Sequence, residues 1–505
     1  MIDDHTMRWL LILWLLTVAL PAQDLLPTRA EQQRAQARFK QLYRSRHAMV
    51  RAQALQELAS MDFPWRVKLL VGVLEGERRR PLAEAALVLP TAIAVLGTTR
   101  HPEGVELLVE ALLEENDRDL RLDLLESLAH VPLDEEGNRP LPRERMATVL
   151  EEGLGGEDLT RMLRALELTA ALGSTDLLPR VLELVAHPEG AVCSAAVRAL
   201  VRLQQDPDRP RGLEELIARL PRERGRLRGE IAGALHRLTG WECKLDADCW
   251  RRTHEAWSAG RQQLGPGQDP EQATTSFFGV PLLSERILFV IDTSPSMLEP
   301  YVVEKGPGAG RRTTKWQLAR EELARAIQAL GGEQSFNILL FDRTVRRWER
   351  ELVPATKRWK ERAITRLQAE QLRQRSMTNF HGALEEALDL AGPGLWSSGG
   401  SQWIDTLVFL TDGHPTTGPV SLNTPLQDEH GRPRRDARGN PVTMSVSDCY
   451  RLLGGLVAQR NRQHRVTIHT VGIGRAHARR LLHRLAKDSG GTYRTVEEEL
   501  ERRGR

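Results

Sequence analysis

Cysteine is scarce in this chain, with 4 residues among 505. Cys243, Cys249 and His254 lie close together in the sequence, but a structural zinc site needs more ligands than these three residues supply. Cys243 and Cys249 could form a disulfide or remain free thiols. We favour the disulfide because the start of the chain indicates export, and disulfides persist in oxidising compartments.

Long apolar runs are also scarce. Residues 9–20 are almost entirely apolar, about the length of a signal-peptide core, and no other segment is apolar enough to cross a membrane. We predict a signal peptide over residues 1–22, with Met7 as the true start because the preceding residues are acidic. The protein is then exported to the periplasm, the cell envelope or the medium. An uncleaved N-terminal membrane anchor is the alternative, and no Cys follows the run to indicate a lipoprotein.

The chain has little net charge, +3 from 71 basic and 68 acidic residues. Basic runs occur at 222–228 and 432–438, but no aromatic residues are interleaved with them. Such runs are typical of a solvated surface rather than of a groove for nucleic acid. We therefore expect no nucleic-acid partner.

Residues 31–260 show a helical pattern throughout, with apolar residues three and four positions apart. Similar helix endings at 127–131, 199–203 and 234–238 lie two repeats and one repeat of roughly 36 residues apart, with Leu172 ending another between them. Helix pairs of this period build an α-solenoid, and the pattern resembles HEAT-type repeats. An irregular helical bundle is the alternative. Trp250 and Trp257 then suit a cap at the end of the stack, before a polar linker at 261–275.

A different pattern begins at residues 287–291, where five consecutive apolar residues are typical of a strand buried on both faces of a parallel sheet. Asp292, Ser294 and Ser296 follow directly. Loops at the carboxyl ends of such strands hold the ligand sites of open α/β sheets. Carboxylate and hydroxyl oxygens favour a hard cation, Mg²⁺ above all. From this stretch alone, an ordinary turn after a strand remains equally open.

Two further stretches strengthen the metal interpretation. Asp412 follows a second apolar strand at 403–411, and Thr378 stands before a helical pattern between the two strands. A doubly wound sheet would bring these three loops together at one edge. The combination resembles the von Willebrand factor A domain and its metal-ion-dependent adhesion site, in which a D-x-S-x-S loop, a threonine and a later aspartate hold one divalent cation.

The resemblance covers residues 276–500 and implies a doubly wound, Rossmann-like α/β domain that follows the all-α HEAT-like solenoid. The lead-in at 277–281 (Phe-Phe-Gly-Val-Pro) is similar to that of exported bacterial proteins that join helical repeats to such a domain. The implied cation is Mg²⁺, or else Mn²⁺ or Ca²⁺. The implied ligands are Asp292, Ser294, Ser296, Thr378 and Asp412.

The family also implies a role for each ligand. Ser294 and Ser296 would contact the cation directly, the two aspartates would balance its charge through water, and Thr378 would join or leave with conformation. A cation held largely by neutral oxygens can accept an Asp or Glu carboxylate from a partner protein. The implied function is therefore protein binding or adhesion, and the oligomeric state stays open.

Two other functions are open to this sequence. The metal could merely brace the loops of a structural scaffold, or the protein could be a metal-dependent hydrolase with Ser294 or Ser296 as nucleophile and His381 or His414 as base. Neither serine lies in a G-x-S-x-G motif, and imidazole suits softer metals, so we interpret the histidines as loop residues. We expect a protein that is not an enzyme.

Within 276–500 the sequence predicts helices at 315–330, 356–374, 379–391, 448–460 and 476–488, and further strands at 336–341, 466–471 and 491–496. An edge hairpin is expected at 344–348. Alternating strands and helices indicate a parallel sheet covered on both sides. A Gly-rich insertion at 298–313 and a polar insertion at 413–447 flank the expected metal edge and could contact a partner.

Overall fold

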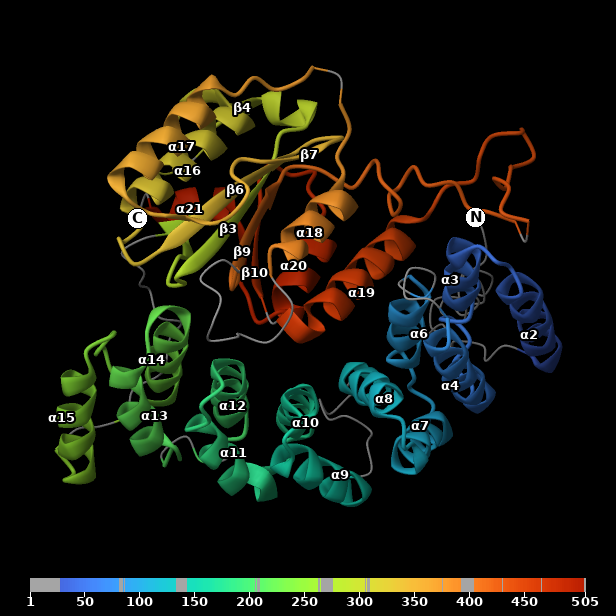
Figure 1. Ribbon diagram of the computed structural model, residues 1–505, viewed down its shortest axis with the longest axis horizontal. Helices are drawn as coiled ribbons and strands as arrows, with labels where there is room; N and C mark the ends of the chain where they lie inside the picture. The colour runs from blue at the N-terminus through green and yellow to red at the C-terminus, as the bar shows by residue number, and fades with distance from the viewer. Residues whose placement is uncertain are drawn as a thin grey trace, which may run out of the picture.

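The computed structural model describes residues 28–503, apart from 81–84, 86, 133–142, 205, 207–208, 262–263, 265–275, 305, 307–308, 375, 392–403, 429 and 465. The predicted signal peptide and most of the predicted linker therefore lie outside the described residues. An array of helices forms the N-terminal half, and an α/β unit forms the C-terminal half (Figure 1). Within the described residues, no helix combines the length and apolar character needed to cross a membrane.

The helical array is built from successive antiparallel helix pairs that stack into a curved layer. The second helices of successive pairs pack on one another, α8 on α10, α10 on α12 and α12 on α14, and they face the α/β unit in Figure 1. The repeated endings noted in the sequence fall at the ends of these second helices. The stack is compatible with the expected HEAT-like repeats. Its α-helices are α2 (Arg29–Tyr43), α3 (Ala48–Glu57), α4 (Pro64–Arg78), α6 (Val88–Leu96), α7 (Pro102–Glu114), α8 (Arg118–His130), α9 (Arg143–Gly155), α10 (Leu159–Leu172), α11 (Leu178–Val185), α12 (Gly190–Arg202), α13 (Leu213–Arg219), α14 (Gly225–Thr239) and α15 (Ala247–Ser258).

The array ends in an aromatic cluster. Trp250 of α15 is fully buried, and Trp241 packs against both Trp250 and Trp257. Cys243 and Cys249 form a disulfide, as expected from the sequence. The other two cysteines are buried free thiols. The Trp241 ring belongs to the cap, in addition to the two tryptophans expected from the sequence.

The α/β unit is organised around one mixed sheet with the strand order β11-β10-β9-β3-β6-β7, and β8 also pairs with β6. The strands from β11 to β6 are parallel, whereas β7 and β8 run antiparallel to β6 at the edge. The strands of this sheet are β3 (Arg286–Asp292), β6 (Ser335–Phe341), β7 (Val345–Arg347), β8 (Val353–Pro354), β9 (Thr406–Thr411), β10 (Thr467–Gly472) and β11 (Tyr493–Thr495).

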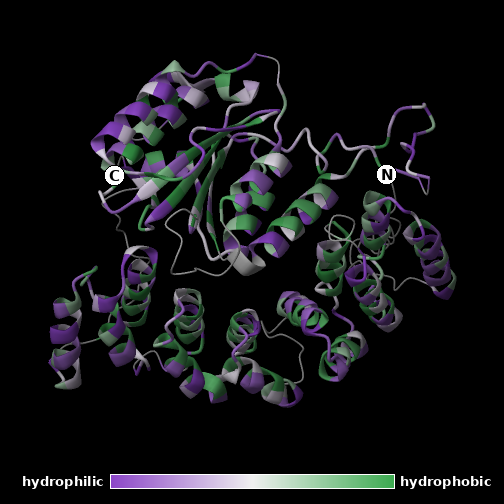
Figure 2. Cartoon of the chain, viewed as in Figure 1, coloured by the Kyte–Doolittle hydropathy of each residue, from purple (hydrophilic) through white to green (hydrophobic). Residues whose placement is uncertain are grey.

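Helices cover both faces of this sheet, as a doubly wound fold requires. Alternate residues of β3 enter different cores: Ile287, Phe289 and Ile291 on one face, and Leu288 and Val290 on the other. The first face packs on α16 (Lys315–Ala329), α17 (Lys357–Ala369) and α21 (Val496–Arg503), and the second on α18 (Phe380–Asp389), α19 (Val446–His464) and α20 (Arg479–Asp488). In Figure 2 the central strands are mostly hydrophobic along their length, as expected for a doubly covered sheet.

Several boundaries differ from the sequence prediction. The helix predicted at 356–374 ends at Ala369, because the backbone becomes extended at Glu370, which is buried and pairs with Arg346 and Arg366. The insertion at 298–313 contains an antiparallel pair, β4 (Pro300–Val302) and β5 (Arg312–Thr314). Helix α21 was not predicted. A short pair, β1 (Ser276–Phe277) and β2 (Val280–Pro281), leads into the sheet.

The two halves contact each other at both ends of the array. Near the array's C-terminal end, Arg226 of α14 donates hydrogen bonds to the Asp405 carbonyl oxygen and to the Thr467 hydroxyl. Near its N-terminal end, α6 packs on α19, and Gln53 of α3 accepts a hydrogen bond from the Gln427 amide in the 413–447 insertion. The 413–447 insertion therefore touches the array. Between the two contacts lies a polar cavity of about 350 Å³.

Candidate metal centre

The first residues of the centre come from two neighbouring strands. Strands β3 and β9 are parallel partners with Ile291 beside Leu410, so Asp292 and Asp412 leave the sheet at the same carboxyl edge. Both carboxylates are buried, at 0% and 2% exposure. The strand pairing brings the chain to this edge at Asp292, the last residue of β3, and at Asp412, the residue after β9.

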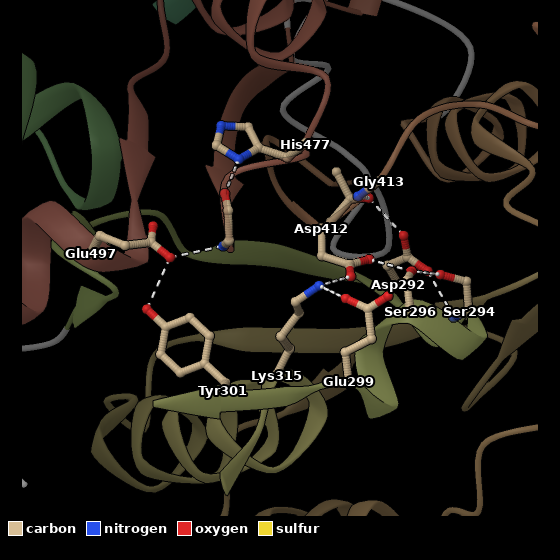
Figure 3. A network of polar contacts seen from close by, with 12 residues as sticks. Asp292, Ser294, Ser296, Glu299, Tyr301, Lys315, Asp412, Gly413, His477 and Glu497 are labelled. Carbon is tan, nitrogen blue, oxygen red and sulfur yellow. Dashed lines mark hydrogen bonds and ion pairs between the residues drawn. The ribbon is translucent and has the colours of Figure 1, made fainter. Parts of the chain in front are cut away.

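A chain of hydrogen bonds connects four of the five residues predicted as ligands (Figure 3). Asp292 accepts hydrogen bonds from the Ser294 amide at 2.8 Å and from the Thr411 hydroxyl at 2.6 Å. The hydroxyl oxygens of Ser294 and Ser296 are 3.1 Å apart, and Ser296 donates to Asp412 Oδ1 at 2.8 Å. The four side chains therefore converge on one point of the sheet edge.

The spacing of these oxygens can be compared with what a cation requires. Octahedral Mg²⁺ has oxygen ligands at about 2.0–2.1 Å, which places neighbouring ligands roughly 3 Å from each other. The Ser294–Ser296 and Ser296–Asp412 oxygen pairs, at 3.1 and 2.8 Å, match this separation. The residues present therefore fit a small, hard divalent cation.

The electrostatics of the edge also fit a cation. Burial, and after it the charge of Asp412, raises the pKa of Asp292 to about 7, although hydrogen bonds from Thr411 and Ser294 act in the opposite direction. Two buried carboxylates on adjacent strands repel one another, and a positive charge between them would offset this repulsion. Across the described residues, no cluster of three His, Cys, Asp or Glu side chains could hold a metal. A cation at this edge would therefore depend on the serine hydroxyls.

Thr378 lies in the loop before α18 and is buried, with 6% exposure. Its amide donates to the Thr416 hydroxyl, and its carbonyl accepts from the amides of Thr416 and Thr417, at 2.9–3.2 Å. The structure thus ties Thr378 to the loop that follows Asp412. In the described part of the chain, the Thr378 hydroxyl forms no hydrogen bond to the side chains of the other four predicted ligands.

His381 and His414, the candidate bases of the hydrolase alternative, do not hydrogen-bond to the serines in the described residues. His414 hydrogen-bonds to the Tyr450 hydroxyl, and His381 lies in the first turn of α18. Burial lowers the pKa of both rings. Neither imidazole forms a hydrogen bond to Ser294 or Ser296 within the described residues.

Sequence reasoning missed a cationic neighbour of the centre. Lys315, the first residue of α16, donates from Nζ to Asp412 Oδ2 at 2.8 Å and to Glu299 Oε2 at 2.6 Å. Burial alone would lower the pKa of Lys315, but the hydrogen bonds and charges of Asp412 and Glu299 outweigh it and raise the pKa. The only signal in the sequence was a lysine at a helix start, where a cation opposes the helix dipole.

Comparison with known proteins identifies the domain that contains this site. Residues 287–414 match one model of the von Willebrand factor type A domain, and residues 456–495 match a second. The chain contains a von Willebrand factor type A domain. Its sequence is similar to inter-alpha-trypsin inhibitor heavy chain 4 of Mus musculus, with 29% identity over 143 residues, 28% of this chain and 14% of that protein. The similarity therefore covers about a seventh of that relative.

Solved structures similar to this A domain include a von Willebrand factor type A protein from Catenulispora acidiphila. It shares 18% identity, covers 44% of this chain and 42% of its own, and has a TM-score of 0.28. Another is proximal thread matrix protein 1 from the mussel byssus, solved with zinc in its metal-ion-dependent adhesion motif. It shares 18% identity over 43% of this chain and 45% of its own, with a TM-score of 0.26.

Proposed function

We propose that this protein is an exported protein-binding protein whose A domain holds one divalent cation, Mg²⁺ or else Mn²⁺ or Ca²⁺. The cation would be held by Asp292, Ser294, Ser296, Thr378 and Asp412, and would take an acidic side chain of a partner protein as a further ligand. When bound, it would supply a Lewis-acidic position at the sheet edge. The protein residues around the cation would make all other contacts with the partner.

The observation that carries the proposal is the convergence of two buried carboxylates and two hydroxyls, in which the Ser294–Ser296 and Ser296–Asp412 oxygen pairs have octahedral spacing. Asp292, Ser294, Thr378 and Asp412 are all buried, whereas Ser296 is partly exposed. The edge is therefore approachable from the Ser296 side. A partner carboxylate reaching the cation from that side would not have to displace a protein ligand.

Exposed basic residues near this edge favour an acidic partner. Arg343 lies two residues after the end of β6, at the carboxyl end beside β3, and it is exposed. Arg373, also exposed, lies 3.8 Å from the Asp342 carboxylate at the same strand end. Positive side chains around a binding site raise the association rate of negatively charged partners and disfavour positively charged ones.

The contacts of the serines support binding rather than catalysis. The hydrolase alternative needs His381 or His414 as a base within hydrogen-bond reach of a serine. Within the described residues, the Ser294 and Ser296 hydroxyls instead bond to each other and to Asp412. Those are the bonds that a cation would replace with metal–oxygen contacts. We therefore propose a non-enzymatic role, in which the helical array serves as a rigid support for the A domain.

Metal-dependent capture tests the proposal. The immobilised full-length chain is exposed to cell-envelope extract in Mg²⁺ or in chelator, and the retained proteins are compared. The Ser296→Ala variant removes the partly exposed donor. Ser60→Ala is the matched control, at an exposed serine of the array whose hydroxyl donates to the Glu57 carbonyl oxygen.

We expect one or more proteins to be retained by wild type and by Ser60→Ala in Mg²⁺, and to be lost in chelator or with Ser296→Ala. Capture that is equal in all four conditions would contradict the cation bridge. That result would instead favour the scaffold alternative, in which a metal only braces the loops.

A further inference from the structure

Lys315 occupies an unusual position for a cation. It is the first residue of α16, where the helix dipole favours negative charge, and its side chain is only 10% exposed. A buried lysine at this end of a helix costs stability unless nearby carboxylates compensate it. Residues that break a local rule of this kind are concentrated at functional sites.

The surrounding structure holds the lysine in place. Strands β4 and β5 pair Pro300 with Thr314, so Glu299 and Lys315 stand side by side at the open end of this hairpin. The lysine stem also packs against Gly474, where an added Cβ would lie 3.2 Å from Lys315 Cε. The insertion at 298–313, expected to be a loop, is thus a hairpin that presents Lys315 to the metal edge.

Asp412 connects Lys315 to the proposed metal centre. Asp412 Oδ1 accepts from Ser296, and Asp412 Oδ2 accepts from Lys315 Nζ, as Figure 3 shows. The carboxylate is thereby fixed with one oxygen towards the serines and the other towards the ammonium group. A cation at the serines and the lysine would therefore sit on opposite oxygens of the same acid.

We propose that Lys315 is an internal counter-charge that lowers the affinity of this edge for divalent cations, so that the centre loads only when the free cation concentration is high. This inference rests on the proposed metal site. The physical reason is Coulombic: a unit positive charge hydrogen-bonded to Asp412 cancels part of the negative potential that attracts the metal. Glu299 has the opposite effect, because it partly neutralises the lysine.

Two substitutions separate this charge effect from mere positioning of Asp412. Lys315→Met keeps the apolar stem and removes the charge, and Lys315→Arg keeps the charge and a donor. If charge decides the affinity, Lys315→Met binds Mg²⁺ roughly tenfold more tightly than wild type, because a unit charge a few ångströms away acts on a divalent ion. Lys315→Arg should stay within about twofold of wild type, and Glu299→Gln should bind more weakly.

The experiment is a calorimetric titration of Mg²⁺ into the full-length wild type and each variant, with far-UV circular dichroism as a check of folding. The rise in melting temperature at a fixed Mg²⁺ concentration is a second readout. If Lys315→Met does not fold, Lys315→Gln replaces it. Tighter binding without the lysine supports the inference, and so does binding that appears only once the lysine is removed.

Two outcomes would overturn the inference, and they have different meanings. If wild type binds Mg²⁺ and the lysine-free variant binds equally or less tightly, Lys315 is a positioning residue only, and the proposed metal site stands. If neither wild type nor any variant binds a divalent cation, the metal site itself is wrong and the role of Lys315 falls with it.

Discussion

His469 offers a quantitative test of how the array and the A domain are joined. It lies on β10, with 9% exposure, and its Nδ1 accepts a hydrogen bond from the Thr492 amide. Burial first, and then the charge of Arg226 on α14, lower its pKa from 6.5 to about 4, although Glu230 acts weakly in the opposite direction. Arg226 hydrogen-bonds to Thr467, two positions earlier on the same strand, so the neutral imidazole lies close to the contact between the two halves.

The lowered pKa of His469 means that acid destabilises the folded protein. Because the pKa of His469 is lower in the folded protein, the unfolded chain binds the proton first as the pH falls. The stability from His469 is therefore complete above pH 6.5 and is lost as the pH drops towards 4. The full loss is about 3 kcal/mol, of which about 2 kcal/mol is lost by pH 5.

The perturbation that isolates this residue is His469→Gln, which keeps an acceptor for the Thr492 amide and cannot be protonated. Between pH 7.5 and pH 5, wild type should lose about 2 kcal/mol more stability than the variant, or about 4 to 8 °C in melting temperature. His483→Gln, at an exposed position of α20, is the matched control and should follow wild type.

Melting temperatures of the three proteins by scanning calorimetry across this pH range give the answer. Comparing proteins at each pH cancels the titration of all other groups that they share. Parallel curves for wild type and His469→Gln would show that the pKa of His469 is not lowered in the folded protein, and would refute a buried imidazole near Arg226.

Three further predictions concern the cap, the start of the chain and Thr378. Replacing Cys243 and Cys249 with Ser removes a bridge across a sequence separation of 6 and should cost about 2 kcal/mol; alkylation of both wild-type thiols without reductant would disprove the bridge. A reporter fused after residue 30 should be found outside the cytoplasm, and cytoplasmic retention would refute export. Thr378→Ala should keep Mg²⁺ in a calorimetric titration but lose most partner affinity; unchanged partner capture would exclude a switchable ligand.

The central strand and the residues at its end could be predicted because their signals are local. Five apolar residues followed by Asp292 specify a buried strand and its exit loop without reference to the rest of the chain. The position of Asp412 after a second apolar strand carries the same kind of signal. Parallel pairing then brings the two acids together, as the sequence argument required.

The features that were not predicted depend on contacts between residues that are far apart in the sequence. Helix α21 is polar along most of its length, and it is held by Arg503, which pairs with both Glu322 of α16 and Glu499. The β4–β5 pair is short and follows no apolar run. The link from Lys315 to Asp412 joins residues 97 positions apart, and neither residue by itself identifies the other.

The most direct test of the account is a calorimetric titration of Mg²⁺ into wild type, Ser296→Ala and Asp412→Asn, with far-UV circular dichroism of each. We expect wild type to bind one Mg²⁺ per chain, and both variants to bind it at least tenfold more weakly while keeping the wild-type spectrum. Equal binding by all three proteins, or no binding of Mg²⁺ or Mn²⁺ by wild type and by Lys315→Met, would contradict the claim that these oxygens form a cation site.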